Sequence, residues 1–583
     1  MNPQVTVLDA GGQYCHLIAR KVRDLGIYAD VAPSDVPASE LRGRKGVIIS
    51  GGPASVYDSS SPTIDAALLT SGIPVLGICY GQQLMAHALG GEVRKGDRGE
   101  YGFAQLDIIH ADTILNGIEG RQQVWMSHRD VVASVPETFE VLASTETCAI
   151  AAMSSPARRL FAVQFHPEVA HTPCGLRILK NFLFDVCACE RDWDPVGQLQ
   201  QLEEQIRAAV GDRSVFFFVS GGVDSTVAYT LCLQALGPER VHGTYVDTGL
   251  MREGETEFVR QNFEKIGARS FEIADAKKEF LDALSTAIDP EKKRHIIGEQ
   301  FVTVQERILE SEHFLNGKWI LGQGTIYPDT IESGGSAKAD LIKTHHNRVA
   351  GIQRLIAEGR IIEPLSSFYK DEVRGIGLQL GLGPELLNRH PFPGPGLAIR
   401  CICTDTGGAL EKTPDGYIIP VRSVGVQGDS RTYRSVLAIE RFPETDEEVP
   451  RLINKLDEVN RVVVAVWTAA PLETMRVYPA ALSEDRLNLL RKADGIVRKL
   501  TRESAYDALI WQNPVILIPV GALNDHNSIV LRPIDSVDGM TASAVRMPAV
   551  LLETIVQELQ ALTGIAGVFY DLTNKPPGTI EWE

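Results

Sequence analysis

The chain has 583 residues, of which 44% are hydrophobic and 23% are charged. This composition is typical of globular proteins and excludes global disorder. The length predicts about three or four domains, each large enough to bury its own core. The formal net charge of −18, without a basic block, argues against a nucleic-acid-binding surface. Local cations and backbone N–H groups must therefore hold any anionic substrate.

The first residues, MNPQVTVLDAGGQ, contain neither the basic region nor the long apolar stretch of a signal peptide. No run approaches the roughly 18 apolar residues of a membrane helix. The nine cysteines form no C-x-x-C pair. Two C-x-C pairs, Cys187/Cys189 and Cys401/Cys403, lack histidine partners at zinc spacing, so we interpret them as reduced thiols. We expect a cytoplasmic (cytosolic) protein without a membrane or nucleic-acid partner.

Residues 1–190 alternate between strand-like and helical stretches and are expected to form a separate domain. The strand-like runs lie at 5–8, 46–50 and 74–78, and the helical stretches at 13–25 and 62–70. This alternation predicts an α/β fold with a parallel sheet covered on both sides by helices.

Cys79 stands between two glycines in LGICYG, where an apolar strand ends and a helix begins. This is the G-x-nucleophile-x-G elbow with cysteine in place of serine, and it places the thiolate at a helix N-terminus. His166 follows another strand in FAVQFHPEV. Glu168, two residues on, points the same way in extended chain and can orient the imidazole. The sequence thus predicts a Cys–His–Glu constellation for covalent catalysis.

Attack on a carbonyl also needs backbone donors for the oxyanion. We expect these donors to be the N–H groups of Gly52, in the turn SGGP, and of Tyr80, which follows the nucleophile. Ser127, His128 and Asp130 are either solvated loop residues or groups that hold a substrate or dock the next domain.

Together, LDAGGQY, SGGP, GICYGQQ and FHPEV closely resemble the class I glutamine amidotransferase domain of the triad type. The resemblance implies that Cys79 forms a γ-glutamyl thioester and releases ammonia. It makes His166 the acid and base and Glu168 its orienting partner, and Gln83 would help to bind L-glutamine.

A second motif, SGGVDST, follows the apolar run 215–219 and precedes a predicted helix over 225–236. Its glycines permit positive φ and bring successive N–H groups to a phosphate chain at the helix N-terminus. Asp224 beside phosphates requires a cation, which we expect to be Mg²⁺. The motif lacks the Walker lysine, and the alternative is a tight turn without a ligand. It resembles the loop of the ATP-pyrophosphatase family, whose members split ATP into AMP and pyrophosphate.

The predicted ATP and pyrophosphate ligands are Ser220, Gly221, Gly222, Val223, Asp224, Ser225, Thr226 and, at the start of a later helix, Lys370. Between these points α/β alternation continues. We expect strands at 240–246 and 319–322, helices at 253–266 and from Asp289 onward, a mobile lid over 324–347 and a rigid loop over 390–396.

An amidotransferase followed by this region is the arrangement of the GMP synthase family. GTIYPD, IKTHHN, KDEVR, HPFPGPGLAIR and KPPGTIEWE carry the resemblance, which runs nearly end to end. It implies that ATP adenylylates the C2 oxygen of xanthosine 5′-monophosphate (XMP), and that ammonia then displaces AMP to give GMP. Mg²⁺ would accompany ATP, and no prosthetic group is expected. The alternatives are another glutamine-fed ligase and a non-catalytic nucleotide sensor.

The segments 417–440 and 515–538 each contain an Ile-Pro-Val strand, a polar turn and a second strand, followed by a helix and a further strand. This pattern predicts a duplicated α+β module of the form β-β-α-β. The chain resembles the longer, eukaryotic-like type of the family, in which such a copy is inserted. The copies could pack on each other within one chain, which leaves a monomer and a homodimer both open. The predicted domains are 1–190, 195–400, 401–500 and 501–583.

The terminal KPPGTIEWE places a cation in a rigid turn, which suits a nucleotide phosphate. Matching positions in the longer type of the family implies that five residues contact XMP: Arg294, Asp429, Gln512, Lys575 and Glu581. For Arg294 the alternative is a solvated helix charge. If residues 575–583 act mainly as a ligand clamp, they should contribute little to the fold; the alternative is a structural tail, which would count against the site assignment there.

Overall fold

The computed structural model describes the whole chain except residues 1, 13, 112, 170, 196, 198, 333–349, 428–429, 446 and 537–541. The chain divides into two compact units. Unit 1 comprises Met1–Leu199 with Ile326–Ala339, and unit 2 comprises Gln200–Thr325 with Asp340–Glu583. Among the described residues, unit 1 contains one sheet and unit 2 contains the others.

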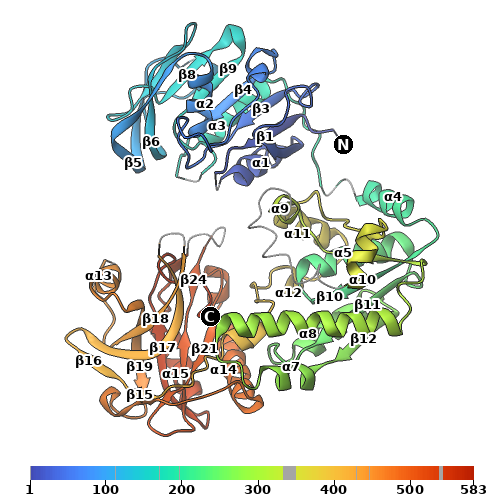
Figure 1. Ribbon diagram of the computed structural model, residues 1–583, viewed down its shortest axis with the longest axis vertical. Helices are drawn as coiled ribbons and strands as arrows, with labels where there is room; N and C mark the ends of the chain where they lie inside the picture. The colour runs from blue at the N-terminus through green and yellow to red at the C-terminus, as the bar shows by residue number, and fades with distance from the viewer. Residues whose placement is uncertain are drawn as a thin grey trace. The chain divides into compact units, whose positions relative to one another are not determined.

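Unit 1 contains a nine-stranded sheet in the order β2-β1-β3-β4-β9-β8-β7-β5-β6 (Figure 1). The parallel half consists of β2 (Ala29–Pro33), β1 (Val5–Asp9), β3 (Gly46–Ile49), β4 (Val75–Ile78) and β9 (Leu160–Val163). The antiparallel half consists of β8 (Ala152–Ser155), β7 (Glu140–Ser144), β5 (Glu92–Ile108) and β6 (Arg121–Ser134). The predicted parallel sheet is therefore confirmed for the first half.

Of the two helical stretches predicted for unit 1, the first lies close to its predicted position. Helix α1 (Cys15–Asp24) buries Cys15, Ile18, Ala19 and Val22, the i, i+3, i+4, i+7 stripe of a helix that packs on a sheet. Helix α2 (Tyr80–Ala88) follows β4 directly. The helix predicted over 62–70 is wrong in extent, because only Ala66–Thr70 form a short 3₁₀ turn, which the Asp65 side chain caps at the Ala67 N–H.

The first sheet of unit 2 is fully parallel, in the order β12-β11-β10-β13-β14. Its strands are β12 (Ser270–Asp275), β11 (Val241–Asp247), β10 (Ser214–Val219), β13 (Trp319–Gly322) and β14 (Ile361–Ile362). Phe216 stacks on Phe314 and Phe217 packs edge-on against Tyr229, because successive residues of β10 face opposite sides of the sheet. Helices therefore cover both faces, and the parallel sheet agrees with the α/β alternation predicted for this region.

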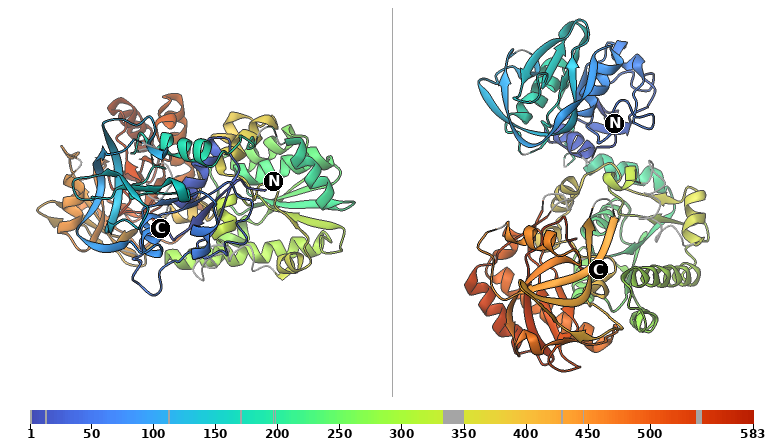
Figure 2. Two further views of the ribbon diagram at one scale, coloured as in Figure 1. Left: turned by 90° about the horizontal axis from the view of Figure 1, so that it is seen from above. Right: turned by 60° about the vertical axis from the view of Figure 1, so that its left-hand side comes forward.

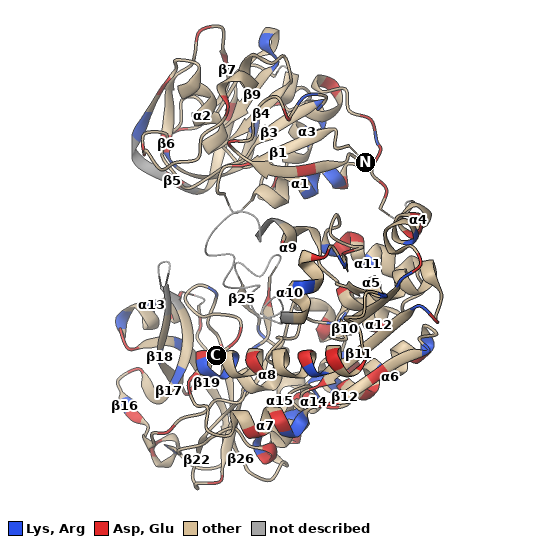
Figure 3. Ribbon diagram, turned by 45° about the vertical axis from the view of Figure 1, so that its right-hand side comes forward, with Lys and Arg blue, Asp and Glu red and all other residues tan. Residues whose placement is uncertain are grey.

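Helices α5 (Val223–Leu236), α6 (Glu255–Lys265) and α11 (Lys370–Gln379) lie on the Phe217 side. Helices α7 (Lys277–Leu284) and α8 (Pro290–Ser311) supply buried residues to the Phe216 side. Asp289 caps α8 by accepting a hydrogen bond from the Lys292 N–H. The long ribbon of α8 runs from near the C-terminal residue along this sheet (Figure 2). Acidic and basic residues are mixed along it (Figure 3).

The second sheet of unit 2 has seven strands in the order β16-β17-β18-β19-β26-β23-β21. They are β16 (Glu411–Thr413), β17 (Gly416–Gln427), β18 (Ser430–Ile439), β19 (Val459–Thr468), β26 (Ile565–Asp571), β23 (Asn527–Leu531) and β21 (Val515–Ile518). Strands β17 and β18 are antiparallel and β18 and β19 parallel. The same pairing recurs in β21, β23 and β26, and the two sets meet antiparallel at β19 and β26.

Along the chain, helix α13 (Glu448–Lys455) connects β18 to β19. Helix α15 (Ala549–Gln560) likewise follows β23 and precedes β26 in the sequence. In the sequence, helix α14 (Glu484–Glu503) follows the first set of strands and precedes the second. The domain boundary predicted at residue 500 therefore falls inside a helix. Among the described residues, no helix is both long enough and apolar enough to cross a membrane.

The last residues of the chain are part of the core of unit 2. Trp582 is fully buried and its Nε1 donates to Asp571 Oδ2 at 2.8 Å. The Val424 N–H donates to the Trp582 carbonyl at 2.8 Å, which ties the tail to β17. The expectation that residues 575–583 contribute little to the fold is therefore wrong, because a large aromatic ring beyond the proline turn fills the interior.

Candidate active sites

The predicted elbow holds Cys79 between β4 and α2. Cys79 has φ 54° and ψ −107°, a conformation that non-glycine residues rarely adopt. The tight turn depends on both flanking glycines. A Cβ at Gly77 would lie 2.6 Å from the Gly81 carbonyl oxygen, and a Cβ at Gly81 would clash with the Ile49 carbonyl. The side chain of Cys79 is thus presented at the N-terminus of α2.

His166 and Glu168 lie beside Cys79. The Glu168 carboxylate, 1% exposed, contacts His166 Nδ1 at 2.7 Å through Oε1. Burial disfavours the protonated imidazole, but the Glu168 charge and the hydrogen bond to Cys79 outweigh burial and raise the pKa of His166 to about 10. The structure therefore brings the three predicted residues together, with a proton held on the imidazole between a carboxylate and a sulfur.

The turn that contains Gly51 and Gly52 passes directly over these side chains. A Cβ at Gly51 would lie 3.0 Å from His166 Cε1 and 3.3 Å from Cys79 Cβ, and one at Gly52 would clash with the Ala10 carbonyl. Only backbone fits so close to the nucleophile. Tyr80 is the first residue of α2, so its N–H has no partner within the helix. Gly52 and Tyr80 thus both belong to the surroundings of Cys79.

The predicted glutamine-binding residue Gln83 is 3% exposed and its amide nitrogen has two acceptors. It donates to the Asp130 carbonyl at 2.8 Å and to Gln164 Oε1 at 3.3 Å. Residues 127–130 lie in β6 and not in a loop. His128 is buried and contacts Glu100 Oε2 at 3.2 Å. The segment is therefore a strand instead of a loop and His128 is not solvated, whereas Ser127 is exposed.

Two groups next to the sulfur were not singled out by sequence reasoning. The Gln164 side-chain amide nitrogen lies 3.6 Å from Cys79 Sγ, and the Ser127 carbonyl oxygen lies 3.7 Å from it. A signal for Gln164 was present, since residues 164, 166 and 168 share the two-residue spacing that placed Glu168 beside His166. No comparable signal marks a backbone carbonyl.

In unit 2 the predicted phosphate loop lies between β10, the central strand of its sheet, and α5. Gly221 has φ 73°, which favours glycine. The hydroxyls of Ser220 and Ser225 lie 3.1 Å apart, and the Gly222 N–H donates to Ser220 Oγ at 3.2 Å. Gly222 is the N-cap of α5, so the first N–H groups of that helix are available to an anion.

Asp224 and Lys370 meet beside this loop. Lys370 is the first residue of α11, and its Nζ donates to Asp224 Oδ2. Asp224 Oδ1 is buried and has no hydrogen-bond partner among the described residues. An unpaired carboxylate oxygen is a hard ligand of the kind that Mg²⁺ binds, so Asp224 fits the predicted cation. A Cβ at Gly324 would lie 2.7 Å from the Ser225 nitrogen, so the chain after β13 packs against the same loop.

Residues 333–349, most of the predicted lid, and Asp429 lie outside the described residues. The start of the lid forms α9 (Tyr327–Glu332), which belongs to unit 1. There the Val31 N–H donates to the Tyr327 hydroxyl at 2.6 Å, and the Arg23 guanidinium lies 4.6 Å from the Tyr327 ring centre.

Of the four described XMP candidates, Gln512 contacts the loop predicted over 390–396, Glu581 is linked to that loop through Arg400, and Arg294 contacts the tail. Gln512 Nε2 donates to the Pro391 carbonyl at 2.8 Å. The Arg400 guanidinium lies 5.2 Å from the Phe392 ring centre and binds the Glu581 carboxylate with two hydrogen bonds, of 2.9 and 2.7 Å. Arg294 donates to the Glu583 backbone oxygen. The fourth, Lys575, exchanges backbone hydrogen bonds with Ala542.

The tail also contains a buried ion pair that sequence reasoning missed. Lys293 Nζ lies 2.6 Å from Glu583 Oε2, and both side chains are almost fully buried. Burial raises the pKa of Glu583, and Lys293 opposes this rise, so the pKa is about 7. Lys293 also donates to the carbonyls of Cys401 and Ala398.

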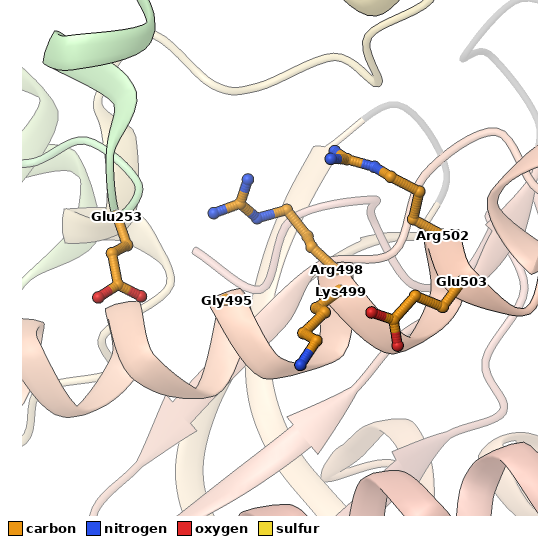
Figure 4. A pocket seen from close by; sticks show the side chains of 6 residues that line it. All are labelled: Glu253, Gly495, Arg498, Lys499, Arg502 and Glu503. Carbon is orange, nitrogen blue, oxygen red and sulfur yellow. The ribbon is translucent and has the colours of Figure 1, made fainter.

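A separate cavity of about 350 Å³ lies along α14 (Figure 4). It is lined by Glu253, Gly495, Arg498, Lys499, Arg502 and Glu503. Arg498 is partly neutralised because its Nε donates to Asp494 Oδ2 at 2.7 Å. The lining thus mixes three cations with two carboxylates and includes no residue that the sequence predicted for a site.

Comparisons with known proteins bear on both units. The Glutamine amidotransferase class-I family matches residues 6–186, the NAD synthase family matches 198–301 and the GMP synthase C terminal domain matches 499–582. A Leptospira interrogans protein named as a probable glutamine-hydrolyzing GMP synthase is 40% identical over 100% of both chains. Glutamine-hydrolyzing GMP synthases of Caldicellulosiruptor saccharolyticus and Aquifex aeolicus are each 38% identical over 99% of both chains.

Proposed function

Because the chain belongs to the family of glutamine-hydrolysing GMP synthases, we propose that its two units carry the two halves of that reaction as follows. Unit 1 hydrolyses L-glutamine to glutamate and ammonia. Unit 2 uses ATP to adenylylate XMP and then lets ammonia replace the activated oxygen, which yields GMP, AMP and pyrophosphate. The Cys79–His166–Glu168 arrangement supports the first half.

In the first half, Cys79 Sγ attacks the amide carbon of glutamine while His166 holds the proton that the leaving nitrogen needs. The N–H groups of Gly52 and Tyr80 stabilise the oxyanion. Ammonia leaves as the sulfur–carbon thioester forms. His166 then takes a proton from water, whose oxygen attacks the thioester, and glutamate is released with the thiol restored. Glu168 keeps the imidazole oriented while its proton leaves with ammonia and is regained from water.

In the second half, the loop Ser220–Thr226 holds the phosphates of ATP at the N-terminus of α5. The C2 oxygen of XMP attacks the α-phosphorus, and the bond to pyrophosphate breaks. Ammonia then attacks C2, and AMP leaves with that oxygen. Adenylylation is needed because a carbonyl oxygen is a poor leaving group. We assign Lys370, on α11, to the phosphates of ATP. Its ammonium group would neutralise phosphate charge when Asp224 holds Mg²⁺ instead of Lys370.

Asp224 is the residue that would hold Mg²⁺, because one of its oxygens is buried without a partner in the described part of the chain. When bound, Mg²⁺ supplies positive charge that offsets the charge of the phosphates. The remaining loop residues act through their N–H and hydroxyl groups.

We assign five residues to the XMP-binding region: Arg294, Asp429, Gln512, Lys575 and Glu581. The proximity of Gln512 and Arg400 to the loop over 390–396, and of Glu581 to Arg400, supports a common binding region. Glu581 is engaged by Arg400, so we assign it the role of fixing that guanidinium. Arg294, which contacts the tail, is assigned to the phosphate.

We also propose that the C-terminal region is a duplicated module and that the chain is of the longer type of the family. The repeated pairing of β17, β18 and β19 in β21, β23 and β26 supports this assignment. Since the two copies share one sheet through β19 and β26, a monomer suffices to complete it. The domain divisions at 190, 400 and 500 and a location in the cytosol remain part of the proposal.

An isotope experiment tests the assigned reaction. XMP labelled with oxygen-18 at C2 is incubated with ATP, Mg²⁺ and glutamine, and the AMP is analysed by mass spectrometry. Attack by the C2 oxygen on the α-phosphorus predicts one label in each AMP and none in pyrophosphate. Unlabelled AMP formed together with GMP would contradict adenylylation of that oxygen.

A further inference from the structure

A chain of side-chain amides extends from β6 to the sulfur of Cys79. The Asp130 carbonyl can only accept hydrogen bonds, so it fixes which end of the Gln83 amide faces it. Gln83 Nε2 donates to this carbonyl at 2.8 Å and also to Gln164 Oε1 at 3.3 Å. Gln164 is fully buried.

The direction of this chain determines what Gln164 presents to the nucleophile. Because its oxygen receives the Gln83 N–H, its nitrogen is turned toward Cys79 Sγ, at 3.6 Å. An amide nitrogen carries two protons and cannot accept a hydrogen bond. The sulfur therefore faces a donor whose orientation is set by Gln83 and, through it, by the backbone of β6.

The two protonation states of the sulfur meet different partners. The neutral thiol can donate its proton to the Ser127 carbonyl at 3.7 Å. The thiolate cannot donate and instead accepts from Gln164 and from the protonated His166. Hydrogen bonds to a charged acceptor are stronger than those to a neutral one. The Gln164 amide thus favours the charged form of the sulfur over the neutral form.

We propose that Gln164 is a catalytic residue of the glutaminase half, which donates a hydrogen bond to the Cys79 thiolate, and that Gln83 is its positioning residue. This inference rests on the proposed function of unit 1. The bond holds negative charge on the sulfur before attack and again when the thioester is cleaved and the thiolate leaves. It also gives Gln83 a role in orienting Gln164, which is distinct from the predicted contact with glutamine.

Substitution of Gln164 by Met tests the proposal, since Met is of similar length and has no donor. Gln82 provides the matched control. It lies in α2 next to Gln83, is fully buried, and donates to the Ile150 carbonyl at 2.9 Å instead of to the sulfur. Both variants, Gln164→Met and Gln82→Met, are compared with wild type for alkylation of Cys79 by iodoacetamide and for glutamine hydrolysis.

At pH 7 we expect Gln164→Met to lower the alkylation rate and kcat/KM for glutamine by about tenfold to a hundredfold, the range for a lost hydrogen bond to a charged group. A purely structural role would lower both rates in Gln164→Met and in Gln82→Met alike. Gln164→Glu should be more severe than Gln164→Met at pH 7, since it places a like charge at the sulfur.

GMP formation from ammonium chloride, which uses only unit 2, should match wild type in every variant, and thermal unfolding of unit 1 serves as the folding control. Equal alkylation of wild type and Gln164→Met at pH 7, or an equal loss in Gln82→Met, would overturn the proposal. A wild-type chain that neither hydrolyses glutamine nor reacts at Cys79 would instead overturn the proposed function of unit 1, so the two failures can be distinguished.

Discussion

His166 determines how the glutaminase unit responds to pH. Burial disfavours its charged form, but Glu168 and the hydrogen bond to Cys79 raise its pKa from 6.5 to about 10. In the unfolded chain the imidazole loses its proton near 6.5, whereas the folded chain keeps it. The raised pKa therefore contributes stability that is fully present below 6.5 and is lost as the pH rises toward about 10.

Between these values the free energy of unfolding of unit 1 should fall with pH, by up to about 1.4 kcal/mol per pH unit from this group. Thermal unfolding at pH 7 and pH 9 measures the effect. His166→Gln removes the titrating group, so its unfolding transition should depend less on pH over the same window. An identical pH dependence in wild type and variant would show that His166 does not hold its proton as described.

Asp224 can be tested by a change that keeps its size. Asp224→Asn removes the charge that would hold Mg²⁺ against pyrophosphate, and it leaves Lys370 facing a neutral amide in place of a carboxylate. Exchange of labelled pyrophosphate into ATP in the presence of XMP should fall by about 10²-fold or more, while glutamine hydrolysis persists. Asp212, exposed in the turn before β10, provides the control Asp212→Asn. Near-normal exchange in Asp224→Asn would exclude the assigned role.

At the scale of elements, the terminal tail is bound to α8 and to the second sheet of unit 2. Lys293 and Glu583 form a buried ion pair, while Asp571 receives two buried arginines, Arg461 at 3.0 Å and Arg532 at 2.8 Å. Trp582 packs against the Arg461–Asp571 pair, with the Arg461 guanidinium 5.3 Å from its ring centre. The tail thus forms part of the core, and the candidate ligand residue Glu581 is held in place by its contact with Arg400.

Breaking the buried pair should be costly. Lys293→Met leaves Glu583 without its cation, and we expect a loss of about 3–5 kcal/mol in the free energy of unfolding of unit 2. Lys292, the exposed neighbour in α8, gives the control Lys292→Met, which should change stability by less than about 0.5 kcal/mol. Denaturant unfolding followed by Trp fluorescence measures both. In the double variant Lys293→Met/Glu583→Gln much of the loss should be recovered, and full additivity would argue against a direct pair.

The elements that sequence reasoning located are those with an apolar run ended by a turn signal. Strands β1, β4, β10 and β13 fall within one or two residues of expectation. The antiparallel strands β5 to β8 were not foreseen. Strands β5, β6 and β7 are partly exposed and carry polar residues on one face, and β8, although buried, is short and contains Ser154 and Ser155. The tail was misjudged for a related reason, since Lys-Pro-Pro-Gly indicates a surface turn while burial of Trp582 depends on distant partners.

In the candidate site, too, some residues could be found from the local sequence and others could not. Cys79, His166 and Glu168 could be found from local spacing, because a turn and a two-residue repeat fix where their side chains point. The partners of Arg400 and Lys293 could not, since each lies more than a hundred residues away along the chain. Gln164 falls between these cases, because its spacing was visible but its donor role depends on Gln83 and β6.

At the scale of the whole molecule, the chain combines a nucleophile elbow in unit 1 with a phosphate loop in unit 2. The reaction joins them through ammonia, which is a nucleophile only while it is unprotonated. Ammonia from solution should therefore replace ammonia from glutamine, although at much higher concentration.

Cys79→Ala is the most direct test of this two-site account. The variant loses the sulfur but keeps the backbone of the elbow and all of unit 2. Glutamine-dependent GMP formation should fall by several orders of magnitude. With ammonium chloride at pH 8.5, GMP formation from ATP and XMP should equal that of wild type under the same conditions. A folded Cys79→Ala variant that ammonium chloride cannot restore, or one that still uses glutamine, would contradict the account.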